Sequence, residues 1–179
     1  MILEPLGLEG AFRLRPERRG DDRGYLERLF CRDDFAFLGL EDCSRQVSHV
    51  VTSKAGTLRG LHFQRAPHAE TKLFWVYQGR MFDVLADLRP ASPTYGQWRG
   101  FELCGEDGSL IYAPKGLAHG YLTLTDDCRM VYHMDTPYAA DHSGGVVWDD
   151  PDLAVFWPAT PRVISEKDRM LPRLAELRA

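Results

Sequence analysis

The residues with the clearest chemical potential lie in an apolar stretch, TLRGLHFQ, at positions 57–64. His62 follows Arg59 by three positions, so an imidazole and a guanidinium lie close together among apolar neighbours. Such a histidine can be a hydrogen-bonded core residue, a metal ligand or a base that works near neutral pH. Strict strand alternation would place the two side chains on opposite faces. Because a glycine inside a strand often marks a bulge, Gly60 predicts that Arg59 and His62 face one cavity.

A second histidine ends the stretch GSLIYAPKGLAH, at positions 108–119. The spacing predicts a strand that ends at Pro114, a turn through Gly116, and a new strand that begins at His119. This spacing resembles the second motif of the cupin superfamily, which consists of small double-stranded β-helix barrels. The first cupin motif normally contains an HxH pair, which is absent after His62.

A metal-dependent cupin oxygenase or isomerase is therefore one alternative, and its ligands would be His62, His119 and Glu70. Metal-binding cupins normally supply several histidines and a carboxylate, and imidazole and carboxylate groups suit transition metals. Without the HxH pair, the pattern favours a site that holds no metal. Elemental analysis of the purified protein would distinguish the two.

Short runs rich in β-branched and aromatic residues position these histidines. We expect strands at 48–53, 61–64, 72–79, 80–88, 97–103, 109–114, 120–125 and 128–134. Turn-forming residues separate these runs, and many short strands at regular spacing predict an all-β sandwich or barrel. Helix is expected only at the edges, over 33–38 and in PRLAELRA at 172–179.

Alternation along two strands predicts which side chains point inward. In CRMVYHM, Tyr132 shares a face with Met130 and Met134, so we expect the phenol to point into the barrel. In RMFDVLADL, Asp83 and Asp87 share one face. These two carboxylates either are solvated or line a polar cavity.

Composition limits the possible partners. The chain has 179 residues and is expected to form a single domain, residues 1–179. A net charge of −4 makes a nucleic acid an unfavourable partner, although a few arginines could hold a small anion. No apolar run approaches the roughly 20 residues that span a bilayer, and no secretory signal is recognised, so a cytoplasmic location is expected. The cysteines form no CxxC pair and are expected to be reduced: Cys31, Cys43, Cys104 and Cys128.

Several segments in order resemble the dTDP-4-dehydrorhamnose 3,5-epimerase family. They are RGLHFQ (59–64), KLFWVYQGRMFDVLADLRPASPTYGQW (72–98), APKGLAHGY (113–121), VYHMDTPY (131–138) and WDDPDLAVFWP (148–158). Members act on a dTDP-4-keto-6-deoxy sugar and invert the carbons beside its ketone, as 3,5- or 3-epimerases. The resemblance implies a jelly-roll cupin barrel with short peripheral helices, no metal and no redox cofactor. It also implies a homodimer that exchanges N-terminal strands.

The resemblance also implies catalytic roles for four residues. His62 would be the base, Asp168 its carboxylate partner, Tyr132 the general acid, and Lys72 the cation that stabilises an enolate. The residue types fit this chemistry, because a hydrogen beside a ketone is weakly acidic and histidine is a base near neutral pH. A cation near the ketone oxygen stabilises the developing negative charge. Inversion requires a second acid on the other face of the sugar, and an inward tyrosine can supply the proton.

Substrate-binding roles follow from the same resemblance. Arg23 and Arg59 would hold the diphosphate, since a planar guanidinium grips phosphate oxygens in pairs. The remaining members of this set are Tyr25, Glu27, Gln46, Ser48, His119 and Tyr138. Ser48 stands where the family usually has asparagine, near the nucleotide.

Each catalytic residue also has a structural interpretation. Lys72 at the start of a strand is ordinarily solvated, and Tyr132 can be a simple core tyrosine. SEKD at 165–168 reads as a helix-capping sequence in which Ser165 is the cap, so Asp168 can reach His62 only if its carboxylate leaves the cap. A nucleotide-sugar-binding cupin without catalytic activity is therefore a third alternative.

Overall fold

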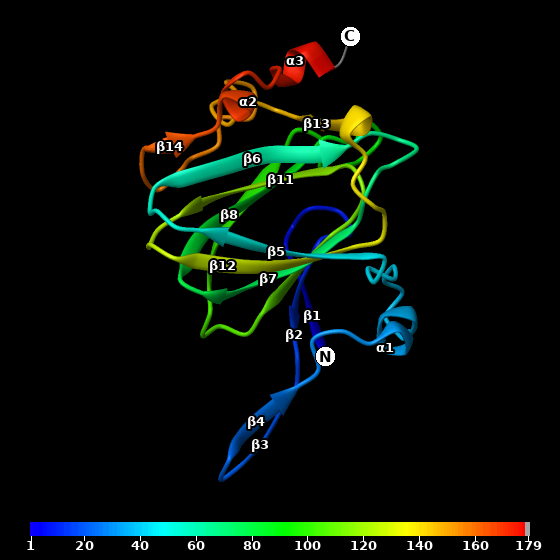
Figure 1. Cartoon of the computed structure of the whole chain (residues 1–179). Helices are drawn as coiled ribbons and strands as arrows, with labels where there is room; N and C mark the ends of the chain where they lie inside the picture. Colours follow the sequence, from blue (N-terminus) through cyan, green and yellow to red (C-terminus); the bar gives the residue numbers. More distant parts are fainter. Residues whose placement is uncertain (178–179) are drawn as a thin grey trace.

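The structure, a computed structural model, describes residues 1–177 and is built mainly of β-strands (Figure 1). The first sheet has six strands in the order β1 (Ile2–Pro5), β2 (Phe12–Arg15), β10 (Leu110–Ala113), β7 (Lys72–Gln78), β12 (Cys128–Met134) and β5 (Gln46–Thr52). The second has β13 (Ser143–Gly145), β6 (Thr57–Gln64), β11 (Leu117–Thr123), β8 (Arg80–Asp87) and β9 (Trp98–Cys104), with β14 (Val163–Ile164) beside β6. All strand pairs are antiparallel except β14 with β6.

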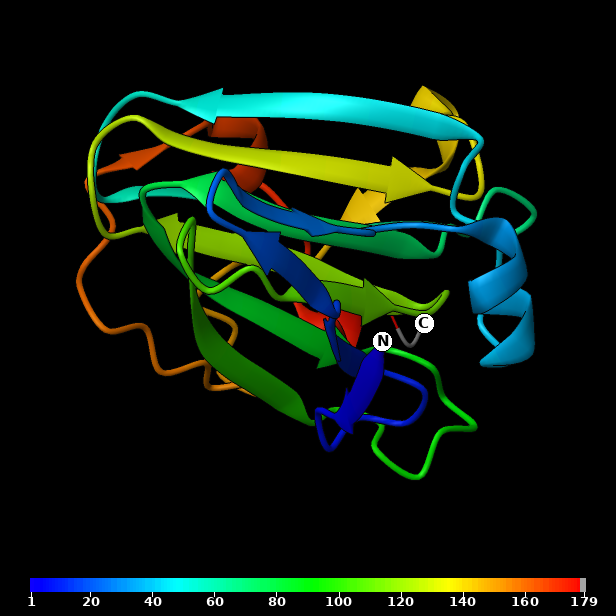
Figure 2. The ribbon, with the colours of Figure 1, turned by 90° about the horizontal axis from the view of Figure 1, so that it is seen from below.

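The remaining elements lie at the periphery. A separate hairpin of β3 (Arg18–Asp21) and β4 (Gly24–Glu27) extends away from the two sheets (Figure 1). Helix α1 (Arg32–Phe37) lies beside one end of the strands (Figure 2), and Ala140–His142 forms a single 3₁₀ turn. Helices α2 (Glu166–Arg169) and α3 (Leu174–Leu177) lie on the side of the second sheet (Figure 1).

The sequence predicted the central strands well and the N-terminal strands poorly. All eight predicted strands are present, with ends shifted by a few residues, and the helix expected at 33–38 is α1. The expected C-terminal helix is present as α3, and residues 178–179 of that prediction lie outside the described part of the chain. Strands β1 to β4 were not expected, because each has only four residues and shows little alternation.

Three apolar clusters hold the layers together. The inner cluster lies between the sheets and joins Phe74, Met130 and Ile111 of the first sheet to Met81 and Leu85 of the second. A second cluster fills the space between the first sheet and α1. A third packs the C-terminal segment, through Leu153 and Leu174, on the outer face of the second sheet. Both sheets are thus covered on both faces over much of their area, which is why many strand residues of both faces are apolar.

The sheets face each other without closing into a barrel. The strand order runs from β1 to β5 in one sheet and from β13 to β9 in the other, and within residues 1–177 no strand pairing joins the two. The expected all-β class is therefore confirmed, and its two sheets face each other as in a sandwich.

The described helices are short, and none of them could cross a lipid bilayer. All four cysteines are free; Cys43 and Cys128 are buried, whereas Cys31 and Cys104 are half-buried and not the fully buried apolar residues that isolated cysteines usually are. Burial raises the pKa of the Cys43 thiol to about 12, so this residue behaves as a small apolar side chain.

Candidate active site

A bulge in β6 lets the side chains of Arg59 and His62 point toward one cavity, although regular alternation would place them on opposite faces of the strand. On β11, His119 lies opposite His62 and Tyr121 lies opposite Arg59, so β6 has one residue more than its partner over this interval. The extra residue is a β-bulge. Arg59, His62, His119 and Tyr121 consequently line one cavity of about 190 Å³. The prediction from Gly60 that both side chains face one cavity is confirmed.

Only glycine fits at the bulge. Gly60 has a φ of +120°, a value that residues with a Cβ rarely adopt. A Cβ built at this position would lie 2.5 Å from the Cα of Gly120 and 2.8 Å from the carbonyl oxygen of His119. The two strands therefore approach each other so closely that the absence of a side chain at position 60 is required.

His62 is held by a buried carboxylate from the other end of the chain. Its Nε2 lies 2.7 Å from Oδ1 of Asp168, and Oδ2 of the same residue accepts a hydrogen bond of 3.3 Å from the backbone N–H of Gly60. Asp168 is 4% exposed. Burial alone would raise the pKa of Asp168, but the hydrogen bonds from His62 and Gly60 outweigh it and lower the pKa.

The backbone N–H and the side-chain carboxylate of Asp168 make separate contacts. The backbone N–H of Asp168 donates to Oγ of Ser165, which caps α2. The side chain meanwhile leaves the helix end and reaches β6. The two interpretations of SEKD are therefore compatible in this structure. Because Nε2 of His62 faces the carboxylate, Nδ1 is the ring nitrogen available to a substrate.

Lys72 is enclosed rather than solvated. It is 7% exposed at the start of β7, and its ammonium group lies 3.0 Å from Oε1 of Glu70. The ammonium also donates a hydrogen bond of 3.2 Å to the backbone oxygen of His62. A buried cation thus lies beside the strand segment that carries the imidazole.

Tyr132 points inward from β12, as alternation predicted. It packs against the inner apolar cluster, with its ring centroid 5.7 Å from that of Phe74 and 5.6 Å from that of His119. Burial raises the pKa of the phenol well above its ordinary value. The phenol therefore keeps its proton at neutral pH and can act as an acid toward a stronger base such as a carbanion.

Both carboxylates of β8 are fully buried, so the solvated alternative for them is wrong. Oδ2 of Asp83 lies 2.9 Å from Nε2 of His119, inside the space between the sheets. Asp87 instead accepts hydrogen bonds from Arg89, Ser92 and Thr94 in the loop that follows its strand. The first carboxylate belongs to the site and the second organises a loop.

A cavity of about 400 Å³ collects most of the predicted site residues. Its lining includes His62, Lys72, His119, Tyr132, Gln46, Ser48 and Tyr138. His62, His119 and Tyr132 also line the smaller cavity that contains Arg59. Oε1 of Gln46 accepts a hydrogen bond of 3.0 Å from the backbone N–H of Tyr138, which fixes the loop at the mouth.

Three of the predicted residues lie elsewhere. Arg23, Tyr25 and Glu27 are on the hairpin β3–β4, outside the two cavities that His62 lines. Arg23 is paired with Asp21, and Glu27 lies 2.8 Å from Arg18. Within one chain, the structure therefore does not bring these residues together with His62.

The sequence interpretation missed several lining residues. Lys167 of α2 reaches the larger cavity, and Tyr121 lines the smaller one. Tyr121 could have been found, because alternation places it on the same strand face as His119. Lys167 could have been found because it immediately precedes Asp168 in the sequence.

Glu70, a candidate metal ligand, is engaged in other contacts. It pairs with Lys72 and accepts a hydrogen bond of 2.9 Å from Nε2 of Gln64. Within residues 1–177, no three His, Cys, Asp or Glu side chains are grouped so that they could hold a metal ion.

One cavity is lined by a base with a carboxylate partner, a protonated phenol and an ammonium group. These are the groups of an acid–base proton-transfer site. Comparison with known proteins agrees with this class. A family model described as dTDP-4-dehydrorhamnose 3,5-epimerase matches residues 5–176. The chain belongs to this family, whose named activity makes its members isomerases.

The similarity extends over whole chains. A dTDP-4-dehydrorhamnose 3,5-epimerase of Sinorhizobium fredii is 40% identical over 99% of this chain and 91% of the relative. A dTDP-4-dehydrorhamnose 3-epimerase of Streptomyces niveus is 34% identical over 99% of this chain and 86% of the relative. The crystal structure of the 3,5-epimerase of Bacillus anthracis, with TDP and PPi bound, has a TM-score of 0.92 and 41% identity, covering 96% and 98% of the two chains.

Proposed function

We propose that this chain inverts one or both carbons beside the ketone of a dTDP-4-keto-6-deoxy sugar, as a 3,5- or 3-epimerase. The observation that carries the proposal is the 2.7 Å contact between His62 and Asp168 in a cavity shared with Tyr132 and Lys72. The family and the names of the relatives support the substrate class.

The first half of the reaction removes a proton. His62 keeps a proton on Nε2 and uses this N–H to donate a hydrogen bond to Asp168. Its Nδ1 takes the proton from the carbon beside the ketone. The electrons of that C–H bond move toward the ketone oxygen and form an enolate. The ammonium group of Lys72 stabilises the charge on this oxygen, most strongly in a site without water. The ionised Asp168 stabilises the imidazolium that forms.

The second half returns a proton on the opposite face. Tyr132 donates its phenolic proton to the carbon, the enolate becomes a ketone again, and a phenolate is left. A proton from water restores the phenol, and the proton on His62 leaves to solvent. No redox cofactor enters this balance, because the carbon has the same oxidation state before and after.

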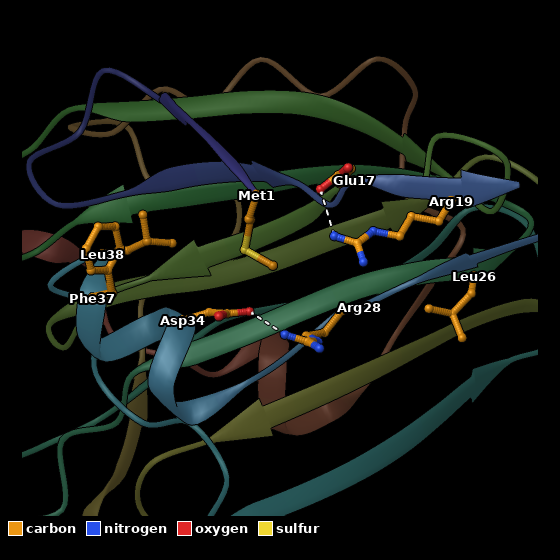
Figure 3. A pocket seen from close by; sticks show the side chains of 8 residues that line it. All are labelled: Met1, Glu17, Arg19, Leu26, Arg28, Asp34, Phe37 and Leu38. Atoms are coloured by element: carbon orange, nitrogen blue, oxygen red, sulfur yellow. Dashed lines mark hydrogen bonds and ion pairs between the residues drawn. The ribbon is translucent and has the colours of Figure 1, made fainter.

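The two facing sheets support a cupin jelly roll for this single domain, residues 1–179. In the same proposal the enzyme is a homodimer, and Arg23, Tyr25 and Glu27 of each hairpin complete the nucleotide site of the partner. The hairpin extends from the body of its own chain (Figure 1), and two of these side chains are exposed on it. A pocket of about 370 Å³ lies between the base of the hairpin and α1, where Arg28 pairs with Asp34 and Arg19 with Glu17 (Figure 3).

The central experiment is proton NMR in heavy water with dTDP-4-keto-6-deoxyglucose. We expect loss of the proton signals at the carbons that exchange, which also shows whether one or both carbons react. His62→Ala should abolish the exchange, and His49→Ala, an exposed histidine on β5, should not. Undiminished exchange in His62→Ala would exclude His62 as the base, and tight binding by the unaltered chain without exchange would favour a binding protein.

The dimer is tested by co-expressing two inactive variants. If the hairpin of one chain completes the site of the other, mixed dimers of His62→Ala and Arg23→Ala contain one intact site. About a quarter of all sites then regain activity when the two chains assemble at random. If Arg23 acts in its own chain, co-expression restores nothing.

A further inference from the structure

Asp83 is a fully buried carboxylate with one oxygen unused. It is 0% exposed on β8, and Met81 and Leu85 of the same strand belong to the apolar cluster between the sheets. Its Oδ2 contacts Nε2 of His119, whereas its Oδ1 is buried without a hydrogen-bond partner in the described part of the chain. Such a group is unusual, because buried polar atoms are nearly always bonded.

A net negative charge on this pair would be costly. Burying an ionised carboxylate without full compensation is among the most unfavourable arrangements in a protein. The nearest cation of the larger cavity, Lys72, is already paired with Glu70. The low-energy arrangement is a neutral pair, in which one proton lies between Oδ2 and Nε2. In agreement with this, burial raises the pKa of Asp83.

The ring of His119 is fixed by its neighbours. Its centroid lies 4.2 Å from that of Phe74, at a tilt of 34°, and the ring of Tyr132 meets it edge-on at 5.6 Å. Nδ1 has no hydrogen-bond partner among the described protein groups, and the residue lines both cavities of the site. A neutral pair has one proton between Asp83 and Nε2 and a second proton on the imidazole. This second proton must be on Nδ1, whether the first is bonded to Asp83 or to Nε2.

We propose that Asp83 is a positioning residue that keeps His119 as an N–H donor at Nδ1, directed at an oxygen of the bound sugar. Asp83 itself touches no substrate and acts through the imidazole. This proposal deepens the epimerase function and rests on it for the identity of the acceptor, the ketone oxygen as it gains charge. A donor there adds to the cation of Lys72, since both favour the enolate over the ketone.

The opposite arrangement is also chemically defined. If Asp83 were an ordinary ionised acceptor, a neutral His119 would donate from Nε2, and Nδ1 would be a lone pair that accepts from a sugar hydroxyl. The two arrangements differ in the proton on one atom, which nitrogen NMR detects directly. Nδ1 of His119 carries a proton in the first arrangement and none in the second, so the two can be distinguished without a substrate.

The decisive measurement is nitrogen-15 NMR of the ligand-free protein with labelled histidine. The signals of His119 are assigned by their loss in His119→Gln. We expect Nδ1 of His119 to carry a proton from pH 6 to pH 8, the range around the ordinary histidine pKa of about 6.5. An unprotonated Nδ1 over this range would overturn the proposal. Because no substrate is involved, this result stands apart from the success or failure of the epimerase assay.

Variants then connect the proton to the reaction. Asp83→Leu removes the partner of Nε2 and keeps the branching of the side chain, and we expect kcat to fall by about tenfold or more, as for other residues that orient an imidazole. Asp83→Asn can still donate an N–H to Nε2 and leave the proton on Nδ1, so it should retain more activity than Asp83→Leu. Because leucine is larger than aspartate, a packing defect would give the same order, and the double variant separates the two explanations.

A double variant tests whether Asp83 acts through His119. In a His119→Gln background, Asp83→Leu should cause no further loss of kcat, because the group that it positions is absent. A full additional loss in that background would contradict the proposal. Thermal unfolding of each variant checks the fold, and if Asp83→Leu fails to fold, the nitrogen signal of the unaltered protein still decides.

Discussion

Replacing Gly60 with alanine tests the bulge that aligns Arg59 with His62. The new Cβ would lie 2.5 Å from the Cα of Gly120, whereas carbon atoms pack at about 3.5–4.0 Å. The two strands must therefore separate by about 1 Å or more at the point where His62 and His119 face each other. A displacement of about 1 Å at a catalytic group can reduce activity by about 100-fold.

The same substitution also lowers stability. A side chain at a φ of +120° costs about 1–3 kcal/mol, and overpacking of closely packed strands costs a similar amount. We therefore expect the free energy of unfolding to fall by about 2–6 kcal/mol. Urea unfolding measures this loss, and solvent deuterium exchange into the sugar measures the loss of activity.

A substitution at a second glycine separates the cost of a positive φ from the cost of a steric clash. Gly96 has a φ of +74°, and a Cβ at that position would meet nothing within 4 Å. Gly96→Ala should lower stability by about 1 kcal/mol and leave the exchange rate unchanged. If Gly60→Ala kept both the exchange rate and the unfolding free energy of the unaltered protein, the reasoning that the bulge requires glycine would be refuted.

Two further predictions concern charged groups. Hydrogen bonds from Arg89, Ser92 and Thr94 outweigh burial and lower the pKa of Asp87 from 3.8 to about 2, so Asp87→Asn should cost about 2 kcal/mol at pH 7. Because the folded pKa is depressed, this contribution is present above about pH 4 and fades as the pH falls toward 2, where urea unfolding of the two proteins should converge. Lys72→Met should reduce kcat by about 100-fold or more with little change in KM, since the cation acts on charge that develops only in the transition state. A rise in KM with kcat unchanged would instead assign Lys72 to substrate binding.

The central strands could be predicted because their signal is local. Runs such as KLFWVYQ combine β-branched and aromatic residues between turn-formers, and alternation along β12 correctly placed Tyr132 inward. The four N-terminal strands carry too few residues for a pattern to emerge. The bulge could be predicted only because Gly60 marks it within a single strand.

The partners of the two histidines are a different matter. Asp168 lies 106 residues from His62, and no spacing rule connects a carboxylate on a helical turn to an imidazole on a strand. The resemblance to a family supplied that pair. Asp83 was placed on a strand face, but its burial depends on the sheet in front of it, which a period of two along one strand does not contain.

The chemistry of this site is carried by strands rather than by loops. His62 lies on β6 between β13 and β11, and Tyr132 lies on β12 between β7 and β5, so each has a hydrogen-bonded strand on both sides. Amide protons beside these residues should therefore be among the slowest in the chain to exchange with solvent, and the base and the acid should stay in place until the sheets unfold. Asp168 lies instead on the short helix α2, so it is the catalytic group that local unfolding can remove first.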